Sequence, residues 1–325
     1  MSVLIFAETE RGKFKKDALE LASYGRSISD EIKSKLVAIC INSNNPEELS
    51  KYGVDKIICV NNNDLENFNS KNFSECISEV FLKEKSQFLI LSSSSNSRYI
   101  GGMLSINPKA AYVSNVFSKP TKYRPLQLRR NSFTNKAYET VEVVSDKVII
   151  SLCRNSYGII ENKVKSEVVS ETFKIANNDI LVSSTEKLSD KVSIADADIV
   201  VSGGRGLKGP ENWHIIENLA DVLGAATACS KPVSDSGWRP HSEHVGQTGK
   251  PVASNLYIAI GISGAIQHLA GINSSKIKVF INTDPDAPFF KSADFGIVGD
   301  AFEVVPELIE KLKKFKSLNN WLLFF

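Results

Sequence analysis

The segment 256–271 most strongly limits how this chain can fold. Its first part, from Leu256 to Ile262, is a continuous apolar run with the length of a buried strand. The part from Ser263 onward holds helix-forming residues with little β-branching, so it predicts a helix. The two parts meet at small residues, Gly261 to Gly264, which let a ligand approach the backbone closely. A strand that turns into a helix in this way gathers free N–H groups and the positive end of the helix dipole, which predicts an anion site, most often for phosphate.

Length and charge limit the class of protein further. With 325 residues, the chain is long enough to bury a core in each of two domains. Its formal net charge of +2 creates no basic field of the kind that attracts nucleic acid or an anionic membrane. No apolar run approaches the length of about 18 residues that a membrane span needs. The chain opens on a strand pattern without the marks of a signal peptide. We therefore expect an intracellular protein that binds no nucleic acid and is not embedded in a membrane.

Cysteine and histidine usage gives no sign of a metal site. The five cysteines are scattered without a CxxC pair, and no pair of the four histidines has the context of zinc ligands. Two of the cysteines, Cys40 and Cys59, lie inside apolar runs, where a reduced thiol packs as a small hydrophobic group. We therefore expect reduced, buried thiols and no bound metal.

Strand and helix patterns alternate over the first 116 or so residues, which predicts a parallel sheet with helices on both faces. The segments 138–144 and 147–152 then predict an antiparallel hairpin around Ser145 and Asp146. After a polar stretch, the α/β pattern restarts and ends with an amphipathic helix over 306–315. The fold class that we predict is therefore α/β, with two domains, 1–192 and 193–325, each a mostly parallel sheet flanked by helices.

A run of serines, Ser92 to Ser97, follows one of the predicted strands. Such a turn can hold a phosphate, but no second glycine and no lysine follow it here. We therefore favour a solvated loop between a strand and a helix.

A glycine-rich turn follows the predicted strand at 198–201. Gly204, Gly206 and Gly209 match the pattern G-x-G-x-x-G between a strand and a helix, which is the context that a dinucleotide-binding turn requires. Arg205 within it adds a charged donor directed at the same anion. We favour nucleotide binding over the alternative of a simple tight turn, although the position late in the chain is unusual for a nicotinamide fingerprint.

Two further segments resemble catalytic motifs and fail to match them. The segment 245–250 resembles a P-loop, but its glycines are too closely spaced and Pro251 replaces the required serine or threonine. With donors on Gln247 and Thr248, it suits a ring or a ribityl chain better than a triphosphate. The segment 261–265 lacks the last glycine of a nucleophile elbow, so acyl transfer by Ser263 is disfavoured.

Three polar residues stand next to these turns. His268 follows Ser263 on the predicted helix, where the neighbouring anion site favours a functional role over a structural one. Asn282 and Asp300 each follow a predicted parallel strand, and ligands bind at the carboxyl ends of such strands. Each of these two residues is equally well explained as a cap or a turn residue.

Taken together, these segments resemble the alpha subunit of electron transfer flavoproteins. The resemblance is dense over about 198–310, where the two glycine turns, the segment 245–250 and the residues after the strands occur in the same order and spacing. Over 1–192 it is looser and lies mainly in the shared α/β layout. It implies a non-enzymatic electron carrier that binds FAD in a Rossmann-like C-terminal domain and forms a heterodimer with an electron transfer flavoprotein beta subunit. The N-terminal domain would contact that partner and hold no cofactor.

The resemblance also implies a redox role and a set of cofactor contacts. Electrons would come from acyl-CoA dehydrogenases and related enzymes of fatty acid β-oxidation and pass, through an anionic flavin semiquinone, to a membrane quinone oxidoreductase. Thr248 would lie near flavin N5 and His268 at the O2 edge. The full set of implied cofactor-binding residues is Arg205, Ser230, Lys231, Val245, Gly246, Gln247, Thr248, Ser263, Gly264, Ala265, Ile266, Gln267, His268, Asn282, Asp300 and Ala301.

One residue departs from the family pattern. Members often carry arginine after the Ser230 position, whereas this chain has Lys231. An ammonium group keeps the charge but lacks the planar fork that stacks on a ring. The family resemblance places the protein in the bacterial cytoplasm, or in the mitochondrial matrix if it is eukaryotic, although no presequence is seen. The alternative is an α/β protein that binds NAD or ADP-ribose in a catalytic or sensory role.

Overall fold

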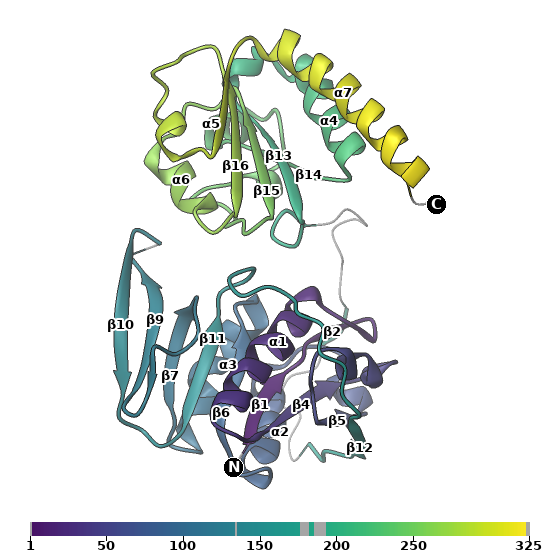
Figure 1. The fold of residues 1–325 in the computed structure, drawn as a ribbon, viewed down its shortest axis with the longest axis vertical. Helices are drawn as coiled ribbons and strands as arrows, with labels where there is room; N and C mark the ends of the chain where they lie inside the picture. The colour runs from purple at the N-terminus through teal and green to yellow at the C-terminus, as the bar shows by residue number, and fades with distance from the viewer. Residues whose placement is uncertain (1, 134, 176–181, 185–192, 323–325) are drawn as a thin grey trace. The chain divides into compact units, whose positions relative to one another are not determined.

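The computed structural model describes residues 2–133, 135–175, 182–184 and 193–322. The chain divides into two compact units, unit 1 over 1–187 and unit 2 over 188–325. Each unit has a central sheet with helices packed against it, which confirms the predicted α/β class (Figure 1). The predicted domain boundary near residue 192 lies outside the described residues.

Unit 1 is built on a ten-stranded sheet in the order β10-β9-β7-β11-β6-β1-β4-β5-β12, with β8 paired to β9. In this order, every pair of neighbouring strands from β7 to β12 is parallel. The strands β8, β9 and β10 form antiparallel ladders. The strands are β1 (Ser2–Phe6), β4 (Lys35–Ile41), β5 (Lys56–Val60), β6 (Ser86–Ser92), β7 (Ala111–Val116), β8 (Lys122–Tyr123), β9 (Leu126–Ser132), β10 (Ala137–Val143), β11 (Val148–Leu152) and β12 (Glu167–Glu171), with a separate pair β2 (Thr9–Glu10) and β3 (Lys13–Phe14).

Helices bury both faces of this sheet. Along β1, Val3 and Ile5 belong to the core cluster that contains residues of α1 (Lys16–Glu31), whereas Leu4 and Phe6 pack with α2 (Ser70–Lys83) and α3 (Ser95–Ile106). Side chains alternate between the two faces of a strand, so a strand that is covered on both sides must be apolar at every position. This requirement explains why the parallel strands read as continuous apolar runs.

The predicted hairpin between 138–144 and 147–152 is wrong. Strand β10 pairs with β9, but β11 lies between β6 and β7 and pairs in parallel with both. All five residues of β11 are buried, whereas β10 is mostly exposed. The two segments are adjacent in sequence, but their burial separates them, because a strand that is apolar throughout belongs in the interior of a parallel sheet.

The serine run is also not a solvated loop. The hydroxyls of Ser92 and Ser97 are buried and each donates to a carboxylate oxygen of Glu8, at 2.7 Å, and Ser94 donates to the same oxygen. Lys15 pairs with the other oxygen at 3.3 Å. Burial raises the pKa of Glu8, but Lys15 and the three hydroxyls together hold it below its ordinary value. A carboxylate of the chain itself therefore fills the space in front of helix α3.

We predict that Glu8→Gln destabilises unit 1 by roughly 2–4 kcal/mol at pH 7, because the ion pair and the charge-assisted hydrogen bonds are lost together. A folded-state pKa below the usual 4.5 means that the carboxylate contributes stability above that pH and loses it as the pH falls further. The difference between the two proteins should therefore shrink in acid. Hydrogen–deuterium exchange of β1 and α3 measures it, with exposed Glu66→Gln as the control. Equal protection of the wild type and Glu8→Gln at pH 7 would contradict the role of Glu8.

Unit 2 contains a five-stranded parallel sheet in the order β14-β13-β15-β16-β17. Its strands are β13 (Ile199–Gly203), β14 (Ala226–Cys229), β15 (Leu256–Ile260), β16 (Ile277–Asn282) and β17 (Phe295–Val298). The chain runs from β13 to β14, which lies on one side of β13, and then to β15, which lies on the other side of β13. Chain connections therefore diverge between β13 and β15, which makes the carboxyl ends of these two strands the expected ligand crevice.

Helices α4 (His214–Leu223) and α7 (Ala301–Leu322) pack side by side on one face of this sheet (Figure 1). The other face carries α6 (Ile266–Ile272) and the segment around Phe289. The helix α7 starts at Ala301 rather than at Pro306 as predicted. Pro306 lies inside α7, where it cannot donate to the carbonyl of Phe302 four residues earlier, so it does not mark the start of the helix.

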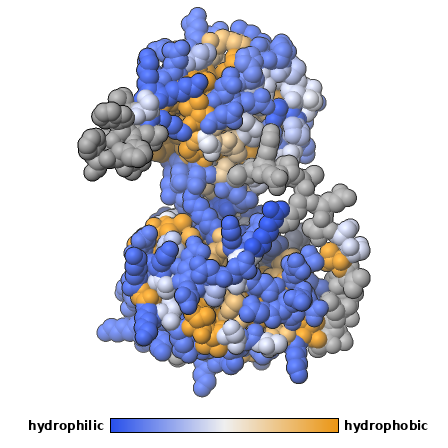
Figure 2. Space-filling model, turned by 90° about the vertical axis from the view of Figure 1, so that its right-hand side faces the viewer, coloured by the Kyte–Doolittle hydropathy of each residue, from blue (hydrophilic) through white to orange (hydrophobic). Residues whose placement is uncertain are grey.

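The face drawn in Figure 2 is mostly hydrophilic, with separate patches of hydrophobic residues. Among the described residues, no helix combines the length and the apolar character that a bilayer crossing requires.

Candidate cofactor-binding site

The two glycine turns meet at the carboxyl ends of β13 and β15. The N–H of Gly204 donates to the carbonyl of Ile260 at 2.9 Å, and the N–H of Gly206 donates to that of Gly261 at 3.0 Å. A Cβ atom on Gly204 would lie 2.1 Å from the Gly261 oxygen, so no larger residue fits without moving the backbone. The sequence placed these turns separately, and the structure brings them into contact at the crevice of the sheet, with Arg205 exposed beside them.

The turn after β15 leaves backbone donors free. Gly261 and Gly264 both have positive φ, 63° and 84°, which glycine adopts at little cost. The helix α6 begins only at Ile266, later than predicted. Within the described part of the chain, no acceptor takes the backbone N–H groups of Ser263, Gly264 or Ala265. These groups are available to a ligand with acceptor oxygens.

The loop 245–250 is fixed against α6. Val245 is anchored to β14 by its N–H bond to Cys229, and Gln247 donates its N–H to the carbonyl of Gln267 at 2.8 Å. Gly246 lies directly against Gly271, where a Cβ would come within 2.7 Å of the Gly246 Cα. These contacts bury the backbone of the loop and leave the side chains of Gln247 and Thr248 exposed.

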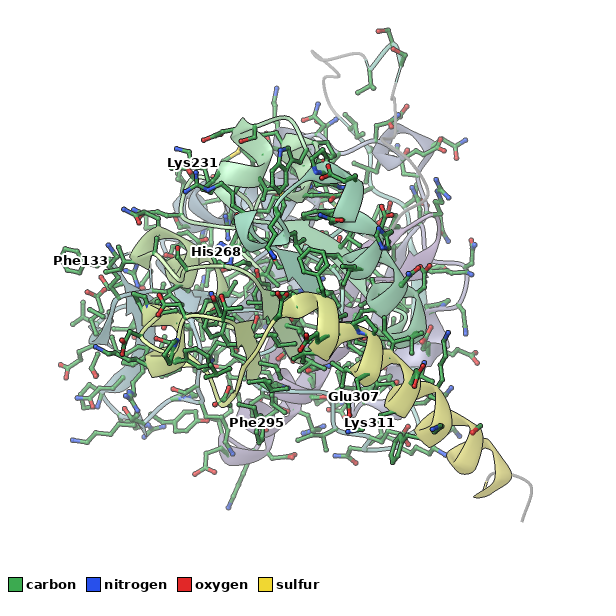
Figure 3. The ribbon with its side chains drawn as sticks, turned by 90° about the horizontal axis from the view of Figure 1, so that it is seen from above. Phe133, Lys231, His268, Phe295, Glu307 and Lys311 are labelled. Atoms are coloured by element: carbon green, nitrogen blue, oxygen red, sulfur yellow. The ribbon has the colours of Figure 1, made fainter. Side chains whose placement is uncertain are left out.

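Ser230 and Lys231 follow β14 at the same edge of the sheet. Ser230 is buried and precedes the short helix α5 (Lys231–Asp235), to which its side chain gives no capping bond. Lys231 lies at the surface of unit 2, whereas His268 lies inside it (Figure 3). The exposed ammonium group therefore provides a positive charge at the rim of the site.

Asn282 and Asp300 have structural roles in the turns after β16 and β17. Asn282 donates its amide to the carbonyl of Ile262 at 3.0 Å, which ties two of the turns together. Asp300 accepts the N–H of Phe302 at 3.0 Å, as an N-cap of α7, and lies 3.6 Å from the ammonium of Lys208. Asp300 is confirmed as a cap and Asn282 as a turn residue, whereas the contact of either residue with a cofactor stays a prediction, as it does for buried Ala301.

His268 is a buried titratable residue of the site, with 6% of its surface exposed. Its Nε2 lies 2.9 Å from the Tyr257 hydroxyl, and its Nδ1 makes no hydrogen bond within the described structure. Burial and the neighbouring His244 lower the pKa of His268 to about 4, against the opposing effect of the Val245 carbonyl. The ring is therefore neutral at pH 7 and carries a single N–H rather than a positive charge.

Sequence reasoning missed two residues beside His268. Tyr257 is completely buried on β15, and His244 is 1% exposed, with an Nδ1 that finds no partner among the described residues. Burial, and secondarily His241, lower the pKa of His244. Tyr257 carries the one hydroxyl in an otherwise apolar strand, and a buried phenol needs a hydrogen-bond partner. That single polar atom is the signal by which it could have been found.

The site suits a large ligand that accepts several hydrogen bonds. It combines free backbone N–H groups, two buried imidazole nitrogens without partners, and glycines that leave the backbone bare. Among the described residues, no group of three histidine, cysteine, aspartate or glutamate side chains is placed to hold a metal ion. These features fit a dinucleotide better than a metal-bound substrate.

Known proteins resemble both units of the chain. The family described as the electron transfer flavoprotein domain matches residues 3–175, and the one described as the electron transfer flavoprotein FAD-binding domain matches residues 193–273. The electron transfer flavoprotein subunit alpha of Thermoanaerobacterium thermosaccharolyticum is 35% identical over 97% of this chain and 98% of its own. That of Bacillus subtilis is 32% identical over 98% of both chains. A probable mitochondrial alpha subunit of Caenorhabditis elegans is 32% identical over 96% of this chain and 93% of its own.

The contact between the glycine turns can be tested by substitution. Gly261 and Gly224 have nearly the same φ, 63° and 66°, but a Cβ at 261 would lie 2.9 Å from Gly206 Cα, whereas the space around 224 is open. Gly224→Ala should cost about 1–2 kcal/mol from the backbone alone, and Gly261→Ala a further 1–3 kcal/mol from crowding. Urea unfolding followed by tryptophan fluorescence reports on unit 2, which contains all three tryptophans. Equal losses in the two variants would show that the turns do not constrain each other.

Proposed function

Because this chain belongs to the family of electron transfer flavoprotein alpha subunits, we propose that it accepts electrons from acyl-CoA and related dehydrogenases and passes them to a membrane quinone reductase. Members of the family carry electrons and do not act as enzymes, and they normally pair with a beta subunit. The cofactor is FAD, whose family-specific domain spans 193–273. We further propose that unit 1 provides much of the contact with the beta subunit and that unit 2 holds the cofactor.

The observation that carries this proposal is the row of unsatisfied donors at the crevice between β13 and β15. The N–H groups of 263–265 suit the diphosphate, with Arg205 adding charge from the facing turn. The loop 245–248 suits the isoalloxazine ring, with the Thr248 hydroxyl toward N5. The adenosine would extend past Asn282 and Asp300. When bound, FAD supplies one-electron chemistry, and its flavin gains negative charge on the first reduction.

His268 provides a fixed donor toward the place where that negative charge develops. The ring is buried and neutral, so its N–H acts in surroundings of low dielectric, where a hydrogen bond is stronger than in water. Lys231 is exposed and acts mainly as a screened charge at the rim. The two residues therefore contribute differently: the imidazole contributes a directed bond, and the ammonium a general field.

The place in the cell that we propose rests on the proposed partners and on the relatives. Relatives include bacterial subunits and one described as mitochondrial. A carrier that serves dehydrogenases of fatty acid β-oxidation would work in the bacterial cytoplasm, or in the mitochondrial matrix of a eukaryote. The competing function is the binding of NAD or ADP-ribose at the same glycine turns, for a catalytic or sensory purpose.

The first test is the colour of the protein. Co-expressed with its beta subunit, the chain should purify as a yellow heterodimer with the absorption of oxidised flavin and one FAD assigned to this subunit. The expected result follows from the donors and the glycine contacts that unit 2 supplies. A colourless heterodimer that takes up NAD and rejects FAD on reconstitution would favour the competing function.

The second test concerns the flavin potential. His268→Ala should keep FAD but lower the first one-electron potential by on the order of 60–130 mV, because a hydrogen bond to a charged group contributes roughly 1.5–3 kcal/mol and about 59 mV corresponds to 1.4 kcal/mol. Spectroelectrochemical titration measures it. The control is His214→Ala, at an exposed histidine on α4, which should leave the potential unchanged. An unaltered potential in His268→Ala would remove His268 from its assigned role.

A further inference from the structure

His268 can act as the proposed hydrogen-bond donor only if its proton is on a defined ring nitrogen. A second residue determines which nitrogen that is. The hydroxyl of Tyr257, on β15, lies 2.9 Å from Nε2 of His268, on α6. We propose that Tyr257 is a positioning residue: its O–H donates to Nε2 and thereby holds His268 as the tautomer with the proton on Nδ1. The part of this inference that concerns the flavin rests on the proposed function, because the Nδ1–H would then be the donor that the cofactor meets.

The direction of this hydrogen bond follows from the protonated phenol, which must donate to an acceptor. Tyr257 has no exposed surface, and burial raises its pKa, so the hydroxyl keeps its proton and requires an acceptor. In the described structure the bond that it makes is the one to His268. The nearby hydroxyl of Ser202 lowers the pKa of Tyr257, against the larger effect of burial, but it makes no hydrogen bond by distance and angle. If Nε2 carried the proton instead, the phenol would lose the one acceptor that it meets at hydrogen-bond distance and angle in the described structure.

The charge state of the imidazole leads to the same tautomer. The carbonyl of Val245 lies near the ring and favours its protonated form, because a carbonyl oxygen can only accept. Burial and the proximity of His244 nevertheless keep the ring neutral, so it carries a single proton. With Nε2 engaged by Tyr257, that proton belongs on Nδ1. Which nitrogen of a histidine is protonated is set by the bond that the other nitrogen makes.

Packing keeps the imidazole from turning over. The ring lies 6.0 Å from the Tyr257 ring and 6.2 Å from that of Phe289, measured between centroids. Phe289 is itself stacked on Phe280 of β16 at 4.6 Å, within the core of unit 2. A ring flip would therefore disturb a packed aromatic layer. The orientation of Nδ1 is fixed by the core, and its protonation by the phenol.

The test measures the tautomer of His268 directly, with and without the phenol oxygen of Tyr257. The FAD-bound heterodimer, labelled with 13C,15N-histidine, is studied by magic-angle-spinning NMR, and the His268 signals are those that disappear in His268→Asn. The wild type should show an unprotonated Nε2 and a protonated Nδ1. Tyr257→Phe keeps the aromatic ring and should shift the tautomer ratio by about tenfold toward Nε2–H, the effect of losing one ordinary hydrogen bond. The first flavin potential should move in the same direction as in His268→Ala.

Tyr24→Phe is the matched control, since it removes another buried phenol, which donates to Ser118 at 3.0 Å in unit 1. It should leave the His268 signals unchanged. A wild-type His268 protonated on Nε2 would overturn the proposal even if Tyr257→Phe failed to fold, and so would a tautomer ratio that is the same in the wild type and in Tyr257→Phe. The tautomer is measured whether or not flavin is bound, so a heterodimer without FAD would refute the proposed function and leave the tautomer result to be judged separately.

Discussion

The site depends on a contact between two stretches of bare backbone. Gly206 approaches Gly261 so closely that neither position accepts a Cβ without displacement, and the hydrogen bonds between the turns are made by the main chain alone. This contact closes the carboxyl ends of β13 and β15 against each other. The backbone N–H groups of residues 263–265, which follow this contact, make no hydrogen bond within the described structure and are available to a ligand at the crevice. The binding surface is thus a consequence of the contact between the two glycine turns at the carboxyl ends of β13 and β15.

The two units differ in what occupies the crevice at the carboxyl ends of their parallel strands. In each, the chain leaves neighbouring parallel strands in opposite directions and opens a crevice, between β1 and β6 in unit 1 and between β13 and β15 in unit 2. In unit 1 the carboxylate of Glu8 fills that place and takes up the hydroxyl donors in front of α3. In unit 2 glycine and serine leave the donors free. An internal carboxylate competes with a phosphate for the same donors, so the chain itself occupies this place in unit 1, whereas unit 2 keeps donors available to a ligand.

How far the sequence predicts such a structure depends on the kind of interaction. The apolar runs at β1, β6 and β15 identify parallel strands because burial on both faces leaves no other composition. The glycine turns reveal the site because close backbone approach requires glycine. The pairing partner of β11 could not be read from its neighbours in the chain, since ladders between distant strands leave no local mark. For the same reason the sequence could not reveal the buried hydrogen bonds between the serine run and Glu8, which lie more than eighty positions apart.

The neutrality of His268 is the part of the site that sequence reasoning had most reason to misjudge. A histidine beside an anion site is easily taken for a cation, but a buried imidazolium here would have to lose its hydration and face His244. A neutral donor avoids both costs and still offers one directed N–H. In the role proposed for it, a neutral His268 would favour the charged form of a bound flavin less strongly than a full charge, which would be little screened at this depth. A carrier must release its electron as readily as it accepts it, so a directed bond of moderate strength suits the task better than a buried charge.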